Sequence, residues 1–357
     1  MFALYLSKRT QRPLSPAARE LLRDVNTEHG VAMALYTASG PFAVLVLSTL
    51  DALRHFESAL CSEDSNLVCN SYDLPQDPHF VKPVIILAAP RAGSTLLFET
   101  LAQAPGVWTL GHESHHVIEF DRKPVEERGN RLIAKDADER TRLFLKNLFL
   151  VGVFDRDSRL LLESGASLAP EYVRLLEKTP KNALRLPFLN ALFPDAHYIY
   201  LYREPIANIS SIFDGWQAPS RFNSYLIDNI QWKFLLPPHW RSLVGRSYAE
   251  IATAQWVSSN ECILDDLYLI PANRRVMVDY DAFIEDPLAH IQHICEACSV
   301  NIDHRFLNLF NAPLPHSAST LAPPAFDKWR KNVDHIAPYL SATESIVSRV
   351  RALLDTQ

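Results

Sequence analysis

A short loop near residue 90 combines the residue types that bind phosphate and sulfate. Residues 90–95 read Pro-Arg-Ala-Gly-Ser-Thr and lie between an apolar segment and an expected helix. At such a position, backbone N–H groups converge on an anion at the N-terminus of the helix. Gly93 allows a close approach of the backbone, and Ser94 and Thr95 add hydroxyl donors. Arg91 adds a charged, forked donor. The loop predicts an anion site, although a tight strand-to-helix turn without a ligand has the same outline.

This loop differs from the loop that nucleoside triphosphatases use. Their loop reads G-x-x-x-x-G-K-[ST], and here the first glycine and the lysine are both missing. ATP hydrolysis is therefore disfavoured as the function. A P-loop kinase is for the same reason the least favoured enzyme class.

Groups that can move protons follow the next expected strand. Residues 111–116 read Gly-His-Glu-Ser-His-His and should return to the edge of the sheet that carries the anion loop. The carboxylate of Glu113 can accept a proton there. The imidazoles of His112, His115 and His116 can do the same. A polar loop with incidental histidines is the alternative interpretation.

Three short, continuous apolar segments are typical of parallel strands buried on both faces. They span residues 84–89, 198–202 and 275–278, and expected helices separate them. Strands that alternate with helices predict an α/β fold with a P-loop-type parallel sheet and helices on both sides. The sequence contains no internal repeat.

The first eighty residues have a different organisation. The sequence predicts a mostly helical extension over residues 1–80 that packs on a main domain spanning 81–357. One helix is expected over residues 15–25, where Ser15 can serve as the N-cap, and another over 48–60.

Residues 31–50 form an uncharged stretch that is long enough to raise the question of a membrane span. Gly40 and Pro41 interrupt it near the middle, and several Thr and Ser residues lie in it. These features favour two short buried elements over one membrane helix. We therefore expect no membrane span.

The overall composition is that of a globular protein. The chain has 357 residues, of which 48% are hydrophobic, and its formal net charge of −6 argues against a nucleic-acid partner. Its five cysteines are an odd number spread over a long chain that starts with no secretory leader, which predicts a cytoplasmic location. Cys295 and Cys298 are expected to be structural thiols.

Two motifs with a defined spacing resemble a known family. Residues 84–97, VIILAAPRAGSTLL, resemble the loop that binds the 5′-phosphosulfate in sulfotransferases dependent on 3′-phosphoadenosine 5′-phosphosulfate (PAPS). That family binds the 3′-phosphate with an arginine, a proline two residues later and a serine eight residues after the arginine. Residues 198–211 supply Arg203, Pro205 and Ser211 at this spacing. Arg203 should leave a strand tip while Ser211 lies two helical turns further on, so that one phosphate can contact both.

Two further segments resemble the bacterial and tyrosylprotein-type branch of this family. Residues 177–180, Glu-Lys-Thr-Pro, match its K-T-P segment, and the resemblance implies that Lys178 points at the sulfuryl group. Residues 328–332 are similar to the W-K-N segment that closes over the nucleotide. Its usual glycine-rich lead is absent here, which leaves the closure of this segment open. Lys178 as a solvated surface lysine and Trp329 as a core residue are the alternatives.

The resemblance implies a set of site residues and no metal. Glu113 matches the base of the tyrosylprotein-type branch, whereas the small-molecule branch uses a histidine, so His112, His115 and His116 stay as rivals. Arg91 and Lys178 would stabilise the charge that develops during transfer. The expected cofactor contacts are Arg91, Ala92, Gly93, Ser94, Thr95, Arg203, Ser211, Trp329, Arg330 and Lys331.

The resemblance implies a PAPS-dependent sulfotransferase that acts by in-line displacement. The expected acceptor is a hydroxyl group, or less favourably an amine, on a small molecule that is either free or tethered to a carrier protein. A non-catalytic nucleotide-binding protein on the same scaffold is the main alternative. Aromatic residues between 212 and 240 are expected either in the core or on a pocket wall: Phe213, Trp216, Phe222, Tyr225 and Trp232.

Overall fold

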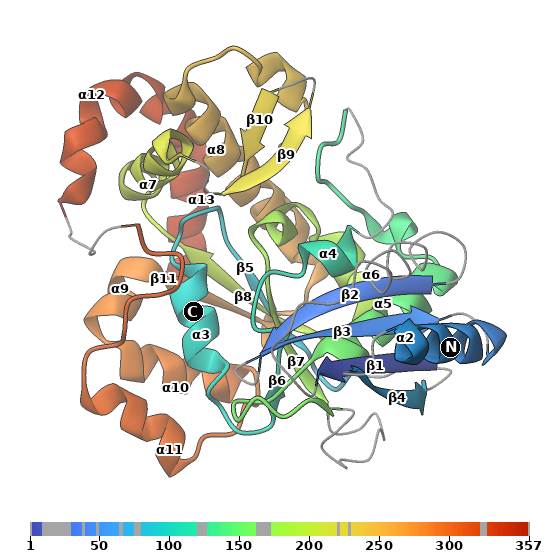
Figure 1. Ribbon diagram of the computed structural model, residues 1–357. Helices are drawn as coiled ribbons and strands as arrows, with labels where there is room; N and C mark the ends of the chain where they lie inside the picture. The colour runs from blue at the N-terminus through green and yellow to red at the C-terminus, as the bar shows by residue number, and fades with distance from the viewer. Residues whose placement is uncertain are drawn as a thin grey trace.

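The computed structural model describes residues 2–8, 30–37, 40–47, 50–63, 67–74, 80–119, 127–161, 173–219, 222–227, 230–321 and 327–355. A five-stranded sheet lies at its centre, with the strand order β11-β8-β5-β7-β6 (Figure 1). All of its strand pairs are parallel. The strands are β5 (Val84–Leu87), β6 (Val107–Trp108), β7 (Arg174–Lys178), β8 (His197–Tyr202) and β11 (Arg275–Asp279).

Helices cover both faces of this sheet, which confirms the expected fold class. On β8, Tyr198, Tyr200 and Tyr202 belong to one core cluster, and the alternate residues Ile199 and Leu201 belong to a second cluster. Because neighbouring side chains of a strand point to opposite faces, the two clusters lie on the two sides of the sheet. The strands are therefore buried on both faces, as their continuous apolar sequences predict.

The helices that form these two layers are short to medium in length. They are α2 (Leu50–Glu63), α3 (Ser94–Leu101), α4 (His115–Ile118), α5 (Glu139–Gly152), α6 (Leu186–Leu192), α7 (Pro205–Gln217), α8 (Tyr248–Asp266), α9 (Tyr280–Glu285), α10 (Pro287–Ala297), α11 (His304–Leu307), α12 (Val333–Ile336) and α13 (Glu344–Leu354). Two single-turn 3₁₀ segments bear on the site, η4 (Pro180–Leu184) and η9 (Lys328–Asn332). A two-stranded hairpin joins β9 (Asn223–Ile227) to β10 (Ile230–Lys233).

The expectation of a mostly helical N-terminal extension is wrong. Four strands, β1 (Phe2–Lys8), β2 (Gly30–Thr37), β3 (Gly40–Leu47) and β4 (Leu67–Asp73), form an antiparallel sheet in the order β2-β3-β1-β4. The interruption of the apolar stretch at Gly40 is confirmed, because Thr37 pairs with Gly40 at the start of the β2–β3 hairpin. Two short apolar runs separated by a glycine are compatible with a hairpin, although short apolar runs do not by themselves distinguish strands from buried helices.

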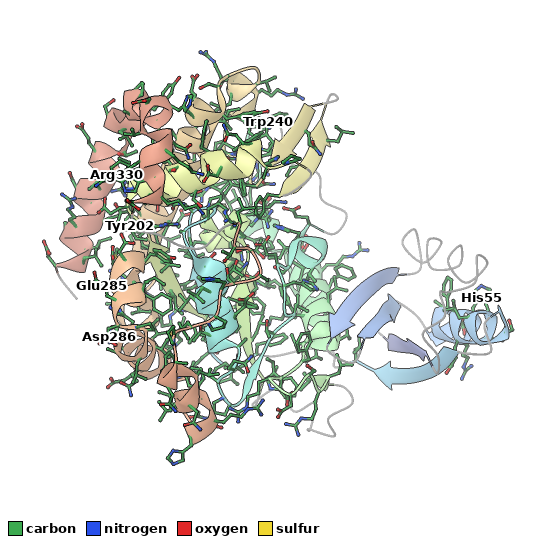
Figure 2. The ribbon with its side chains drawn as sticks, turned by 60° about the vertical axis from the view of Figure 1, so that its left-hand side comes forward. His55, Tyr202, Trp240, Glu285, Asp286 and Arg330 are labelled. Carbon is green, nitrogen blue, oxygen red and sulfur yellow. The ribbon has the colours of Figure 1, made fainter. Side chains whose placement is uncertain are left out.

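The helix expected over residues 48–60 is confirmed as α2, whereas the one expected over 15–25 lies outside the described residues. Strand β3 contacts α5 of the main body. Figure 2 shows α2, which carries His55, on the side of this sheet that faces away from the central sheet. In the described parts of the chain, no helix combines the length and the apolar character needed to cross a bilayer. The division of the chain at residue 80 stays a proposal.

Candidate active site

A cavity of about 950 Å³ opens at the carboxyl edge of the central sheet. Every strand of the sheet is followed by residues that line this cavity. They are Arg91, Gly93, Ser94 and Thr95 after β5, Glu113 after β6, Pro180 and Lys181 after β7, Arg203 after β8, and Tyr280 after β11. The carboxyl ends of parallel strands form the usual ligand site of such folds, so the topology explains why these distant residues meet.

The predicted anion loop leads directly into α3. Gly93 is the N-cap of the helix, in the left-handed conformation with φ +99°. A Cβ atom at this position would lie 2.2 Å from Cε2 of Tyr280, so the ring of Tyr280 occupies the space that any other residue would need. Ser94 and Thr95 line the cavity, whereas Ala92 is buried beside it. The loop thus presents the N-terminus of α3 to the cavity.

Arg91 ties this loop to a distant segment of the chain. Its Nη1 donates a hydrogen bond of 2.7 Å to the carbonyl oxygen of Ser319, and its guanidinium lies 4.7 Å from the ring centroid of Phe222. Arg91 and Ser319 both line the cavity. One side chain therefore supplies positive charge to the cavity and fixes part of its wall.

Arg203 and Ser211 reach the same cavity, as their spacing predicts. Arg203 Nη1 donates to the carbonyl oxygen of Arg91 at 3.2 Å, and the guanidinium lies 4.5 Å from the ring centroid of Tyr280. Burial lowers the pKa of Arg203. Its Nε atom is buried with no hydrogen-bond partner among the described residues. A buried cation with an unused donor is suited to bind an anion.

Glu113, Lys178 and His115 form a connected group at the other end of this anion loop. Lys178 Nζ lies 2.9 Å from Glu113 Oε1 and 3.3 Å from Thr95 Oγ1. His115 Nε2 lies 2.7 Å from Glu113 Oε2. Lys178 is only 4% exposed, whereas the side chain of Glu113 is 35% exposed and lines the cavity. His115 lines the cavity as well, and its side chain is also 35% exposed, so a bound molecule can reach Glu113 and His115 but not the buried Lys178.

These contacts set the charges in the group. Burial alone would raise the pKa of Glu113, but the hydrogen bond from His115 and the charge of Lys178 outweigh it and lower the pKa to about 2. Burial lowers the pKa of His115 and outweighs its bond to Glu113. A neutral His115 donates its Nε2 proton to the carboxylate, which leaves Nδ1 as an acceptor that is buried without a hydrogen-bond partner in the described chain.

Of the other two histidines, the structure describes the side chain of His112 only. His112 Nδ1 lies 3.1 Å from the carbonyl oxygen of Glu113, and its side chain does not line the cavity. The side chain of His116 lies outside the described residues. The structure thus brings one of the three candidate histidines together with Glu113.

A buried carboxylate holds Glu113 and Lys178 in place, and the sequence analysis did not identify it. Glu177 is 3% exposed and accepts hydrogen bonds from Ser114 Oγ at 2.5 Å, Thr179 Oγ1 at 2.6 Å and Asn182 Nδ2. Burial raises the pKa of Glu177. Ser114 follows Glu113, and Glu177 precedes Lys178, so this network sets the distance between the two charged side chains.

A second buried ion network, also missed from the sequence, lines the cavity near His115. Lys181 Nζ lies 2.8 Å from Glu119 Oε2 and donates to Tyr225 Oη at 2.6 Å, and Arg185 pairs with the other oxygen of Glu119. Burial lowers the pKa of Lys181 to about 8. Burial would raise the pKa of Glu119, but the charges of Arg185 and Lys181 outweigh it and lower the pKa to about 2.

The segment η9 borders the cavity, but only one of its three expected cofactor contacts lines it. Trp329 lines the cavity, and so does Lys328, which was not predicted. Arg330 and Lys331 do not line it. Arg330 is exposed. Lys331 instead pairs with Asp214 at 2.9 Å.

Aromatic residues between 212 and 240 divide between the core and the cavity. Phe213, Trp216 and Trp232 are buried in the core, whereas Phe222 lines the cavity together with Phe234. Tyr280 also lines it and was missed. Its place directly after β11 was the available signal, since the carboxyl end of each strand contributes to the site. No group of His, Cys, Asp and Glu residues in the described chain could hold a metal ion.

Comparison with known proteins gives a family match over most of the chain. The sequence model of a family described as the sulfotransferase family matches residues 83–304. The matched region contains the anion loop, Glu113, Lys178, Arg203 and Ser211.

Individual relatives are distant. An uncharacterised protein of Aquifex aeolicus (strain VF5) is 19% identical over 269 residues, which are 72% of this chain and 32% of that protein. The chain thus spans about a third of the length of this curated relative. The sulfotransferase domain of the Synechococcus PCC 7002 olefin synthase is 22% identical, with 72% of this chain and 90% of that chain covered and a TM-score of 0.40. The sulfotransferase domain of the curacin biosynthetic pathway is 17% identical, with 72% of this chain and 98% of that chain covered and a TM-score of 0.42.

Proposed function

The chain belongs to the sulfotransferase family, and from this premise we propose that it transfers a sulfuryl group from PAPS to a hydroxyl group of a small molecule. The observation that carries the proposal is the meeting of three sets of residues in one cavity. The anion loop, the Arg203 and Ser211 pair, and the Glu113 carboxylate all line it. Two anion sites and one base are what this reaction needs.

The donors around the cavity fit PAPS. Gly93 and its helix N-terminus, with Arg91, Ser94 and Thr95, would hold the 5′-phosphosulfate. The buried Nε of Arg203 and the hydroxyl of Ser211 would hold the 3′-phosphate. Trp329 would border the nucleotide. Arg330 and Lys331 lie off the cavity and would act only from outside it.

When bound, PAPS supplies a sulfur atom that forms a bond to the acceptor oxygen while its bond to the 5′-phosphate oxygen breaks and leaves the electron pair on that oxygen. The residues of the chain position the acceptor, remove its proton and stabilise the negative charge. Glu113 would take the proton, because its carboxylate lines the cavity and each oxygen can accept one more hydrogen bond. Arg91 and Lys178 would stabilise the developing charge.

His115 is better suited to hold Glu113 than to act as the base. Its Nε2 is engaged with Glu113, and its Nδ1 is buried. Both side chains line the cavity, but the free nitrogen of His115 is buried, so an acceptor hydroxyl would contact the carboxylate more readily than this nitrogen. His112 lies off the cavity. These contacts favour Glu113 among the candidates.

The acceptor side of the cavity suggests a mixed chemical character. Phe222 and Phe234 offer an aromatic wall, and Lys181 with Glu119 offers polar contacts. An acceptor with an apolar body near its hydroxyl fits this lining. Attachment to a carrier protein and a cytoplasmic location remain parts of the proposal. The free thiols of Cys262, Cys295 and Cys298 are compatible with a reducing compartment.

Calorimetry with adenosine 3′,5′-bisphosphate and with ATP and magnesium tests the proposal. We expect the bisphosphate to bind and ATP to bind much more weakly, because Arg203 and Ser211 match a 3′-phosphate. Transfer of ³⁵S from labelled PAPS to a panel of hydroxylated small molecules then tests catalysis. Preference for ATP would favour a kinase, and bisphosphate binding without any ³⁵S transfer across the panel would favour a non-catalytic nucleotide-binding protein.

A further inference from the structure

Lys178 stands between the anion loop and the base. From the end of β7, its ammonium contacts Thr95 Oγ1 on one side and Glu113 Oε1 on the other. Thr95 and Glu113 both line the cavity, and Lys178 lies buried behind them. One positive charge is therefore shared between the place for the phosphosulfate and the place for the acceptor proton.

This arrangement conflicts with the role of Glu113 as a base. A general base works best when its pKa lies near the working pH. The pKa of Glu113 is lowered to about 2, with His115 and Lys178 as the groups that lower it. A carboxylate in this state holds its negative charge but has little tendency to take a proton from a hydroxyl group.

We propose that Lys178 couples the phosphosulfate site to the base. Before binding, its ammonium is paired with the carboxylate of Glu113, and a phosphosulfate that contacts Thr95 draws this ammonium towards the phosphosulfate oxygens. This inference rests on the proposed function. It assigns Lys178 a role besides the stabilisation of the leaving group. The base becomes competent only in the presence of the sulfuryl donor, and the acceptor loses its proton only when transfer can follow.

The charges around Glu113 support the direction of the effect. The charged and titratable groups that face it are Lys178 from β7 and His115 from α4, and Lys181 from η4 adds a longer-range attraction. Lys178 is one of the two groups that lower the pKa of Glu113. A phosphosulfate that draws the ammonium of Lys178 towards Thr95 would therefore raise the pKa of Glu113 from its lowered value.

Proton uptake on binding of PAPS measures this coupling without any turnover. The full-length protein is titrated with PAPS by calorimetry at pH 5 and pH 8, in buffers of different ionisation enthalpy. We expect the wild type to take up more protons than Glu113→Gln at pH 5, and equal amounts at pH 8. Glu139→Gln, which changes an exposed carboxylate of α5 away from the cavity, should match the wild type at both pH values.

A second variant distinguishes the effect of Lys178 from the direct effect of the ligand's negative charge on the pKa of Glu113. In Lys178→Met, Glu113 lacks its cationic partner before binding, so the uptake assigned to Glu113 should fall to less than half of the wild-type value. Equal uptake by the wild type and Glu113→Gln at pH 5 would overturn the inference, and so would an unchanged uptake in Lys178→Met. Failure of PAPS to bind the wild type would instead contradict the proposed function itself.

Discussion

Asn332 Nδ2 donates a hydrogen bond of 2.9 Å to Asp214 Oδ1 and thereby joins the segment η9 to α7. The same amide nitrogen lies 2.9 Å from Ser210 Oγ, and the neighbouring Lys331 pairs with the second carboxylate oxygen of Asp214. Ser210, Asp214 and the adjacent Trp329 line the cavity. Asp214 therefore links α7, which carries the proposed 3′-phosphate contact Ser211, to η9, which borders the proposed nucleotide site.

We predict that Asp214→Ala weakens binding of adenosine 3′,5′-bisphosphate about tenfold, because it removes the hydrogen bond from Asn332. A hydrogen bond to a charged group contributes about 1.5–3 kcal/mol, and water that replaces Asp214 recovers part of this. Lys331→Ala, which removes only the half-exposed ion pair, should change affinity less than about threefold. Calorimetry measures both. Equal effects of the two variants would show that the link from Asn332 does not position η9.

Gly93→Ala should destabilise the protein and displace Tyr280, because the added Cβ meets the ring of Tyr280 at 2.2 Å and the backbone has φ +99°. Gly106→Ala is the matched control, since Gly106 has φ +76° but no heavy atom within 4 Å of the new Cβ. The free energy of unfolding of the control should fall only by the cost of placing alanine in the left-handed backbone conformation, about 1–2 kcal/mol. Chemical denaturation measures both variants, and a loss in Gly93→Ala no larger than in the control would contradict the steric argument.

Arg203→Ala should weaken adenosine 3′,5′-bisphosphate binding about 10- to 100-fold, as expected for the loss of a charge-assisted hydrogen bond. Binding of adenosine 5′-phosphosulfate, which has no 3′-phosphate, should change much less. Arg330→Ala removes an exposed arginine that does not line the cavity and should leave both affinities unchanged. Equal losses for the two ligands in Arg203→Ala would place the 3′-phosphate elsewhere.

The ion network around Glu119 should make the protein sensitive to acid. The pKa of Glu119 is lowered to about 2 in the folded state, so its contribution to stability is complete above the ordinary value of 4.5 and is lost as the pH falls towards 2. The contribution at pH 7 is about 3 kcal/mol. Urea unfolding should therefore show that Glu119→Gln is less stable than the wild type at pH 7, with the difference reduced by more than half at pH 3.

Glu139→Gln, an exposed change on α5, should show no such difference at either pH. A constant gap between Glu119→Gln and the wild type from pH 7 to pH 3 would indicate that the glutamine acts through packing and not through the lost charge.

The central fold and the anion loop could be predicted from local sequence, because continuous apolar strands and the turn at Gly93 depend on neighbouring residues. The placement of Arg203 and Ser211 at one cavity could also be predicted, since Arg203 follows the end of β8 and Ser211 lies on the helix that comes directly after it. The contacts of Glu177, Tyr280 and Asp214 could not, because each depends on partners brought near by the folded sheet. The N-terminal sheet was missed because short apolar runs in residues 31–47 fit either a buried helix or a strand.

The hydrogen bond from Arg91 to Ser319 closes a chain separation of 228 residues. During synthesis the anion loop leaves the ribosome long before its covering wall exists, and the strands around it have to pair across long intervening segments, which is a slow kind of folding. The nascent protein therefore passes through a stage in which the anion loop has been synthesised but the segment around Ser319 has not. If the cavity binds a nucleotide as proposed, its binding site is complete only after the segment around Ser319 has been translated. A ligand that contacts both segments would then favour the completed fold over earlier intermediates.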